Sequence, residues 1–315
     1  MDNKRVCLED IGKELGVSKN SVSRALRDCS DISESLKEKV RNKAKEMHYI
    51  PNNTSILLRQ NTSKFVGIIT CDLLNPYYSI NIDRLIKVLK AKGYVPITIL
   101  TDSGFLDFEV LKILVNYQVQ AVISFQDLTQ ETYDFIKINN FPVILYGLKS
   151  EFPGICAVYS DDVMGGELVA KECIKLGRKN PCFITWDDVE TSKRREEGFY
   201  STLNANGLQP EKLVIGYSND FDYVKLILNK QYDFIFAYCD MLANDVISSL
   251  KKVGYKDYTI YGFDGVSSYI SLCKHIKSIS ASTDEMCNYI VEVIGNIKNI
   301  RDLSLKKRVF KVKIC

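Results

Sequence analysis

Residues 8–26 of the chain, LEDIGKELGVSKNSVSRAL, decide the fold of its N-terminal part. Apolar residues recur at helical spacing on both sides of Gly16, which predicts two short helices joined by a tight turn. Ser18 stands where the second helix begins, and serine is a favoured N-cap. The side chains expected to face inward are Ile11, Val22 and Leu26. The stretch therefore predicts a helix–turn–helix.

A third helix is predicted to complete this small domain. It is expected to begin at the cap residue Ser33, and lysines and arginines separate the residues of its inward stripe: Leu36, Val40, Ala44 and Met47. A helix, a glycine-containing turn and a second helix that opens with polar residues is the form that places side chains in the major groove of DNA. Hairpins of this kind also occur in proteins that bind no DNA, so spacing alone leaves a structural role open.

Charge is distributed unevenly along the 315 residues. The segment up to Lys64 holds 13 Lys and Arg against 9 Asp and Glu, whereas the rest of the chain holds 29 against 30. The net charge of +3 therefore comes from the N-terminal segment. This is the distribution expected if that segment alone meets a polyanion.

The sequence pattern changes twice after the third helix. Residues 52–63 are polar apart from three apolar residues at 56–58, which predicts a linker with a marginal helix. Beyond it, short buried strands such as FVGII at 65–69 alternate with amphipathic helices, and this pattern restarts after Gly165-Gly166, so two parallel α/β lobes are expected. The predicted domains are residues 1–51, the linker 52–63 and a body at 64–315, whose lobes span about 64–159, plus part of the C-terminal segment, and about 160–282.

Several classes of protein are disfavoured by what the sequence lacks. No run approaches the roughly 18 apolar residues of a membrane span, and the charged N-terminus has no apolar stretch like that of a signal peptide, so a cytoplasmic protein is expected. The ten cysteines are scattered without a Cys-x-x-Cys motif, and His48 and His275 stand alone. We therefore expect no metal site, no cofactor and no catalytic residue.

An enzyme and a sugar-binding transport protein are the alternatives for an α/β body. The motifs GxGxxG, GxxxxGK(S/T), GxSxG and HExxH, which place phosphates, a nucleophile or zinc, are absent from the sequence. A transport protein would need a signal peptide and would lack the helix–turn–helix. Turnover of a bound ligand would favour the enzyme, and loss of residues 1–60 without consequence would favour the transport protein.

The motifs of this sequence resemble those of the lactose/galactose-repressor (LacI/GalR) family. The matching residues at the N-terminus are Asp10-Ile11, Gly16-Val17-Ser18, Val22-Ser23-Arg24, Leu26, Ile32-Ser33, Tyr49-Ile50-Pro51-Asn52 and Leu58-Arg59. Those in the body are Val66-Gly67-Ile68, Asn75-Pro76-Tyr77, Asp161, Gly165-Gly166, Arg195, Gly198-Phe199 and Gly262-Phe263-Asp264. The chain departs from the family at Cys7, where a helix-capping Thr is usual, and at Asn53, where a basic or small residue is common.

The resemblance implies a fold and a DNA-reading face. The implied fold is a small all-α helix–turn–helix domain, joined by a hinge helix to an α/β body of two doubly wound parallel-sheet lobes like those of periplasmic binding proteins. The residues implied to read base edges are Lys19, Asn20, Ser23 and Arg24. Lys and Arg suit the acceptors of guanine, and Asn suits adenine.

Other residues are implied to position the protein on DNA. Those expected to contact phosphates are Ser18, Ser21, Tyr49 and Asn52. The segment from Asn53 to Gln60 resembles the hinge helix, which is too short to be stable alone in water. Within it, Leu58 is implied to enter the minor groove as an apolar wedge.

The resemblance also implies an effector site between the lobes. Arg195 and Asp264 stand where relatives bind polar groups of the effector, commonly sugar hydroxyls. Further residues expected to line this site are Asp72, Tyr77, Tyr146, Thr191, Phe236 and Asp240. This set suits a carbohydrate, although purines bind the same scaffold. Cys239 replaces an Asn that often precedes Asp240, which puts one familiar sugar contact in doubt.

The implied function is that of a repressor of carbohydrate-utilisation genes. A palindromic operator requires a symmetric protein, so a homodimer is expected to bind double-stranded DNA. Binding of a small molecule is expected to change the pose of the lobes and thereby order or melt the hinge helices. Two questions stay open: whether the effector releases or strengthens DNA binding, and whether the assembly is a dimer or a tetramer.

Overall fold

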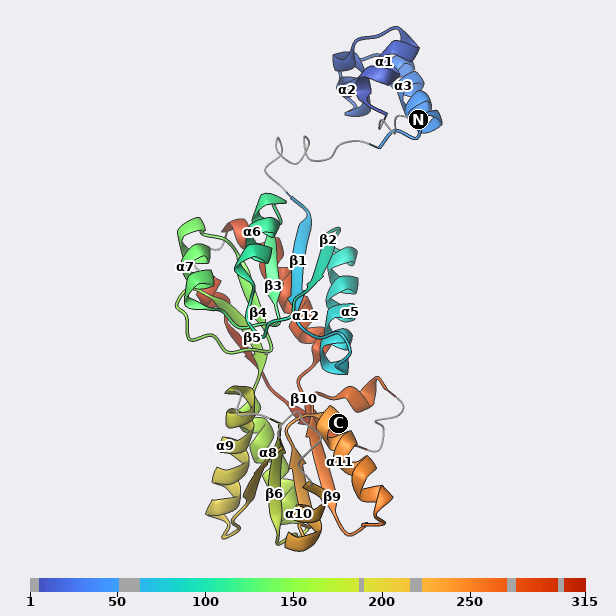
Figure 1. Ribbon diagram of the computed structural model, residues 1–315. Helices are drawn as coiled ribbons and strands as arrows, with labels where there is room; N and C mark the ends of the chain where they lie inside the picture. The colour runs from blue at the N-terminus through green and yellow to red at the C-terminus, as the bar shows by residue number, and fades with distance from the viewer. Residues whose placement is uncertain (1–5, 51–62, 187–189, 216–222, 271–275, 300–302) are drawn as a thin grey trace. The chain divides into compact units, whose positions relative to one another are not determined.

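The computed structural model describes residues 6–50, 63–186, 190–215, 223–270, 276–299 and 303–315. Contacts within the chain divide it into two compact units, Met1–Thr62 and Ser63–Cys315 (Figure 1). None of the helices in these described ranges is long and apolar enough to cross a membrane.

The first unit forms the helix–turn–helix and the third helix that the sequence predicts. Its helices are α1 Leu8–Leu15, α2 Lys19–Leu26 and α3 Glu34–Glu46. The hydroxyl of Ser18 caps α2 by accepting a hydrogen bond from the backbone N–H of Ser21 at 3.0 Å, and Ser33 caps α3 through the N–H of Leu36 at 3.3 Å. Gly16 ends α1 in the left-handed conformation, with φ 65°.

The core of the first unit is small and apolar. Its buried residues are Ile11, Val22, Ala25, Val40 and Ala44. Leu26, Leu36 and Met47, which were expected inside, are half-buried and pack against this core. Cys7 stands where a helix-capping Thr is usual, and Asp10 supplies a bond at this helix end instead. The backbone N–H of Cys7 donates to Oδ2 of Asp10 at 2.8 Å. A carboxylate at the third helical position thus satisfies the N-terminus of α1 where a capping side chain is weak.

Two six-stranded sheets form the second unit. The first has the strand order β11-β5-β4-β3-β1-β2 and the second β12-β10-β9-β8-β6-β7. Neighbouring strands are parallel except β10 and β12, which are antiparallel. The strands of the first sheet are β1 Phe65–Thr70, β2 Val95–Leu100, β3 Ala121–Ser124, β4 Val143–Tyr146, β5 Cys156–Ser160 and β11 Arg308–Phe310. Those of the second are β6 Pro181–Thr185, β7 Glu211–Val214, β8 Phe234–Ala237, β9 Thr259–Phe263, β10 Lys277–Ser280 and β12 Lys313–Ile314.

Helices cover both faces of each sheet, so both lobes are doubly wound as expected (Figure 1). On the first sheet, α5 Pro76–Ala91 and α12 Thr283–Gly295 pack on one face, and α6 Phe108–Asn116 and α7 Gln130–Asn139 pack on the other. On the second sheet, α8 Asp162–Lys175 and α9 Glu190–Ala205 pack on one face, and α10 Tyr223–Lys230 and α11 Asp240–Lys252 pack on the other. Short 3-10 helices lie at Val266–Ser268, Ile297–Asn299 and Leu303–Lys306.

The chain passes between the lobes more than once. It leaves the first lobe between β5 and α8, returns between β10 and α12, and crosses again between β11 and β12. The C-terminal segment therefore adds one strand to each sheet. Several connections of this kind let two lobes change their relative pose while each stays folded.

Helices α8 and α9 approach so closely that their crossing requires glycine. A Cβ atom on Gly166 would lie 2.1 Å from the carbonyl oxygen of Arg195, and one on Gly198 would lie 2.0 Å from that of Val163. The expectation that the second lobe restarts after Gly165-Gly166 was therefore wrong in one respect. These glycines lie inside α8, which begins at Asp162, because the helix needs them for packing rather than for a preceding turn.

We expect Gly198→Ala to destabilise the second unit by about 1–3 kcal/mol or more, the usual cost of overpacking. The added methyl group would meet backbone atoms of α8, which cannot move as a side chain can. Gly104→Ala is the matched control, since no atom lies within 4 Å of a Cβ placed there. Urea unfolding measures the stability of both variants. If Gly198→Ala unfolds at the same urea concentration as the wild type, the helix crossing accommodates the methyl group without loss of stability.

Candidate functional site

The residues predicted to read bases lie on one short helix. On α2, Lys19, Asn20 and Arg24 are exposed and Ser23 is half-buried. Asn20 and Arg24 are four residues apart, so they lie on the same face of the helix. The guanidinium of Arg24 forms an ion pair with the carboxylate of Asp31, which lies between α2 and α3. Two cations and an amide are thus presented to solvent within two helical turns.

The residues predicted to contact phosphates have mixed surroundings. The Oγ of Ser18, besides capping α2, lies 2.9 Å from the Oγ of Ser21, so both hydroxyls stand at a helix N-terminus, which favours anions. Tyr49 is half-buried against the core, and its N–H donates to the carbonyl of Ala44 at 2.8 Å. Asn52 and the proposed wedge Leu58 lie outside the described residues.

A cavity in the second unit brings together four of the residues predicted to bind an effector. Tyr77, Tyr146, Arg195 and Asp264 line it. Sequence reasoning missed its other wall residues, which are Asn81, Ser160, Phe263, Ser280, Ala281, Thr283 and Met286. The cavity volume is about 20 Å³. A space of that size holds about one water molecule, whereas small-molecule sites usually measure about 300–1,000 Å³.

Arg195 is the most extensively bonded residue of this cavity wall. Its buried guanidinium donates from Nε to Oδ1 of Asp162 at 3.0 Å and from Nη1 to the carbonyl of Tyr238 at 2.7 Å. Its Nη2 lies 3.6 Å from Oδ1 of Asp264, and its central carbon lies 3.6 Å from the ring centre of Phe263. Burial alone would lower the pKa of Arg195, and the two carboxylates more than offset that effect. The guanidinium therefore stays charged inside the protein.

Asp162, which sequence reasoning missed, is a buried partner of Arg195. Its side chain is buried at the first turn of α8 and also accepts a hydrogen bond from Nη2 of Arg194 at 2.6 Å. The sequence offered one indication of Asp162, which is that it directly follows Asp161, a residue that matches the family motifs. Only the crossing of α8 and α9 shows that Asp162, rather than Asp161, meets Arg195, because Oδ1 of Asp161 instead caps α8 by accepting the N–H of Met164.

Asp264 is held in an unusual backbone conformation. Its φ is 107°, a value that residues other than glycine rarely adopt, and its N–H donates to the carbonyl of Ile279 at 2.8 Å. Burial raises the pKa of Asp264 well above its usual range, and the nearby Arg195 partly counteracts this effect. Such strained backbone positions often occur at ligand sites. The carboxyl group is therefore fixed in the cavity wall rather than free to follow solvent.

The first-lobe side of the cavity is formed by a short polar chain. The hydroxyl of Tyr146 donates to Oδ1 of Asn81 at 2.5 Å, and Nδ2 of Asn81 donates to the carbonyl of Tyr77 at 2.7 Å. Burial raises the pKa of both tyrosines, so they are neutral donors and acceptors. Gly147 leaves room for the Tyr77 hydroxyl, since a Cβ there would lie 2.2 Å from it.

Phe236 and Asp240, which were expected to line the effector site, do not line this cavity. Phe236 is fully buried in the core between the second sheet and α8 and α9, where its ring packs on Phe183 and Phe199. Strand residues alternate between the two faces of a sheet, and this one faces the helices. Asp240 is also fully buried, and its carboxylate accepts hydrogen bonds from the Ser278 hydroxyl at 2.6 Å and from the N–H of Val266 at 2.7 Å.

Asp72 and Thr191 also lie outside the lining of this cavity. Oδ1 of Asp72 accepts the N–H groups of Leu74 at 2.7 Å and Asn75 at 3.1 Å, which shapes the turn before α5. The hydroxyl of Thr191 lies 3.3 Å from that of Tyr238. Both side chains are half-buried, and these hydrogen bonds serve the local backbone or a neighbouring side chain.

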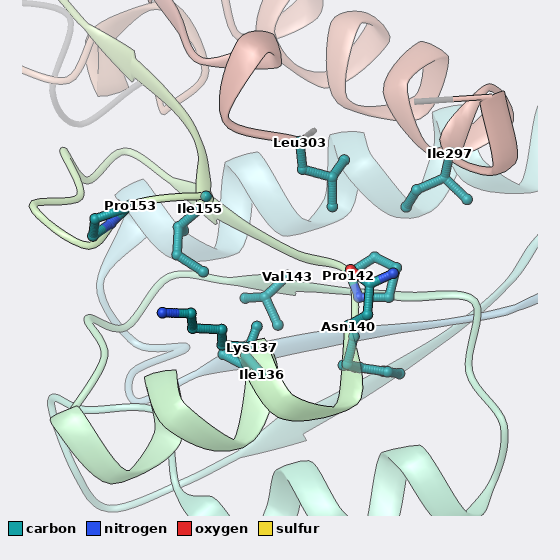
Figure 2. Close-up of a pocket in the computed structure, with 11 residues that line it drawn as sticks. Ile136, Lys137, Asn140, Pro142, Val143, Pro153, Ile155, Ile297 and Leu303 are labelled. Carbon is teal, nitrogen blue, oxygen red and sulfur yellow. The ribbon is translucent and has the colours of Figure 1, made fainter. Parts of the chain in front are cut away.

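A second cavity lies within the first lobe, with a volume of about 210 Å³ (Figure 2). Its walls combine apolar side chains such as Ile136, Ile155 and Leu303 with the polar residues Lys137 and Asn140. None of the residues singled out in the sequence lines it. Across the described ranges, no group of three or more His, Cys, Asp or Glu side chains is placed to hold a metal ion.

Asp240→Asn is expected to change how stability depends on pH. Burial raises the pKa of Asp240 from 3.8 to about 7, although its hydrogen bonds from Ser278 and Val266 oppose the shift. A carboxyl group with a raised folded-state pKa stabilises the fold fully below pH 3.8 and loses that contribution as pH rises to about 7. Urea unfolding of the wild type should therefore show a loss of stability between about pH 4 and 7 that is smaller in Asp240→Asn. If the stability of the wild type and of Asp240→Asn changes with pH in the same way, the loss comes from other titratable groups.

Comparison with known proteins finds similarity to bacterial regulators in both units. Residues 7–52 match the family described as bacterial regulatory proteins, lacI family. MalR, an HTH-type transcriptional regulator of Clostridium butyricum, is 25% identical over 320 residues, which cover 92% of each chain. The sucrose operon repressor of Lactococcus lactis subsp. lactis is 25% identical over 298 residues, covering 91% of this chain and 92% of the repressor.

A solved structure shares the whole fold. The lac repressor dimer bound to operator and the anti-inducer ONPF superposes with a TM-score of 0.81 at 17% identity, covering 99% of this chain and 98% of that one. The family match falls on α1, α2 and α3, and the relatives align over nearly the whole chain as regulators rather than enzymes. Residues 7–52 thus match the lacI family of bacterial regulatory proteins, and nearly the whole chain is similar to transcriptional regulators.

Proposed function

We propose that this protein is a sequence-specific DNA-binding repressor of carbohydrate-utilisation genes, controlled by a sugar or sugar derivative. It acts in the cytoplasm as a homodimer on a palindromic operator. The observation that carries the proposal is the exposed face of α2, where Lys19, Asn20 and Arg24 project from a well-capped helix of a basic domain. The MalR and sucrose operon repressor relatives support the same role.

DNA reading follows from the chemistry of that face. Lys and Arg donate to the O6 and N7 acceptors of guanine, and Asn bonds the N6 and N7 atoms of adenine with two hydrogen bonds. Ser18 and Ser21 at the start of α2 suit phosphate oxygens, which fix the register of the helix on the duplex. Two such units related by a twofold axis would read two half-sites, as the lac repressor dimer in the operator complex supports.

The effector site proposed here is the cavity with Arg195 and Asp264. A guanidinium donates and a carboxyl group accepts or shares hydrogen bonds, so the pair suits adjacent sugar hydroxyls. The rings of Tyr77 and Phe263 add apolar surface for the C–H face of a sugar. Because the cavity measures about 20 Å³, a sugar requires the lobes to move apart. Effector binding would thereby favour one pose of the lobes and change the fit of the dimer to its operator.

Replacing Asn20 or Arg24 with Ala should cost about 1–3 kcal/mol of operator affinity and weaken discrimination at one position of each half-site. The cost arises because each side chain is assigned a base edge with two hydrogen bonds. Fluorescence anisotropy with the selected operator and with random duplexes measures both quantities. Equal losses on the operator and on random DNA would make these residues phosphate contacts and reject the base-reading assignment.

Asp264→Asn should weaken sugar binding at least several-fold while DNA affinity without sugar stays unchanged. A buried group that bonds a ligand typically contributes about 1–3 kcal/mol per hydrogen bond. The sugar is found first by a thermal-shift screen of monosaccharides, disaccharides and phosphosugars, and calorimetry then gives the affinities.

Asp134→Asn is the matched control for this experiment, since its exposed carboxylate lies on α7, outside the cavity lining, and accepts a hydrogen bond from the Gln130 amide. Arg195→Lys is a second test, because lysine keeps the charge and loses the planar fork of donors. Arg195→Lys also removes hydrogen bonds to Asp162 and Tyr238, so the stability of this variant is measured alongside its affinity for the sugar. Wild-type sugar affinity in both cavity variants would reject this site.

A further inference from the structure

The first unit contains an acidic residue in direct contact with the proposed DNA-reading face. The guanidinium Nη2 of Arg24, in the last turn of α2, forms an ion pair with Oδ2 of Asp31. The two side chains are 45% and 47% exposed, so the pair lies at the surface of the unit. A carboxylate at this place is unexpected in a surface that meets phosphates, because it repels them.

Stabilisation of the fold does not explain this pair. An exposed ion pair adds little to stability, because water screens the charges and both side chains lose freedom. Three residues earlier, Asp28 has the structural role instead. It forms ion pairs with Lys37 at 3.3 Å and Arg41 at 2.7 Å, and Lys37 is only 6% exposed. Asp28 thus holds the turn onto α3, whereas Asp31 engages a residue of α2.

The geometry of a guanidinium allows it to bond a carboxylate and a base together. Its planar fork carries five N–H donors, so contact with Asp31 on one edge leaves donors for the N7 and O6 acceptors of guanine. An arginine held in one rotamer also loses less freedom when it binds. The pair therefore prepares Arg24 for guanine before DNA arrives.

The carboxylate itself also distinguishes bases. Ionised Asp only accepts hydrogen bonds, so it favours the amino groups of cytosine and adenine. It disfavours the O6 of guanine and the O4 of thymine, which are acceptors. Asp31 follows α2 by five residues and is exposed like Arg24, so both reach the same side of the unit through their contact.

We propose that Asp31 is a specificity-determining residue of the DNA-binding unit. It holds Arg24 in the orientation that bonds guanine, and it favours a base with an amino group, cytosine or adenine, next to that guanine. This inference rests on the proposed function. It extends the base-reading surface from α2 to the turn between α2 and α3.

The test compares base preferences of the full chain and of four variants, which are Asp31→Asn, Arg24→Ala, the double variant that carries both changes, and Asp28→Asn. Duplexes with randomised half-sites are selected by the wild type, and each half-site position is then titrated with all four bases. In Asp31→Asn, the preference for guanine at the Arg24 position should fall by about tenfold, while affinity for random DNA stays equal or rises because a repelling charge is gone. In the Arg24→Ala background, Asp31→Asn should leave the remaining preference at that position unchanged, as expected if Asp31 acts through Arg24.

Asp28→Asn is the matched control. It removes the same charge from the same turn, and Asn tolerates the φ of 62° at this position. Its base preferences should equal those of the wild type, whatever the change in overall affinity. Unchanged preferences in Asp31→Asn, or equal changes in both variants, would overturn the inference. A wild type that selects no sequence at all would instead reject the proposed function, on which the inference rests.

Discussion

The burial of one guanidinium, that of Arg195, organises the second unit. A buried charge requires an opposite charge and hydrogen-bond acceptors close by, because water no longer solvates it. Arg195 obtains these from Asp162 at the start of α8, from the carbonyl of Tyr238 after β8, and from Asp264 after β9 at a longer distance. The network therefore joins α9 to three other parts of its lobe. Loss of one partner would leave a charge uncompensated, which costs far more than an exposed pair.

That network depends on backbone contact between two helices. Gly166 and Gly198 let α8 and α9 touch at distances where no Cβ fits, and this contact brings Asp162 to Arg195. The same helices bury Phe199 and Phe236 against the sheet. Packing and site geometry thus share one cause, so a change at the helix crossing would affect both stability and the cavity wall.

The small cavity makes ligand binding and lobe movement inseparable. Tyr77 and Asn81 face Arg195 and Asp264 across about 20 Å³, with residues of both lobes in the lining. Under the proposed function, a ligand the size of a sugar would separate them, and the connections near Ser160, between β10 and α12, and between β11 and β12 would absorb the change. The first lobe begins at β1, directly after the predicted hinge segment. A repressor needs such a route from an effector to its DNA-binding unit.

The sequence alone determined the elements whose signals are local. Helical spacing and the caps Ser18 and Ser33 defined α1, α2 and α3, and alternating strands and helices predicted a doubly wound body. Sequence patterns did not mark β5, β10, α12, β11 and β12. Pairings such as β11 with β5 join segments about 150 residues apart, and short strands carry little periodicity of their own.

Tertiary structure decided which of the residues suggested by the sequence meet in the cavity. Family resemblance placed Tyr77, Tyr146, Arg195 and Asp264 there, and the structure brings these four together. In the structure, Phe236 lies in a core, and the buried Asp240 joins α11 to β10 and to the 3-10 helix at Val266–Ser268. A sequence shows that a strand has two faces, but which face meets helices and which end meets a ligand depends on contacts between distant segments.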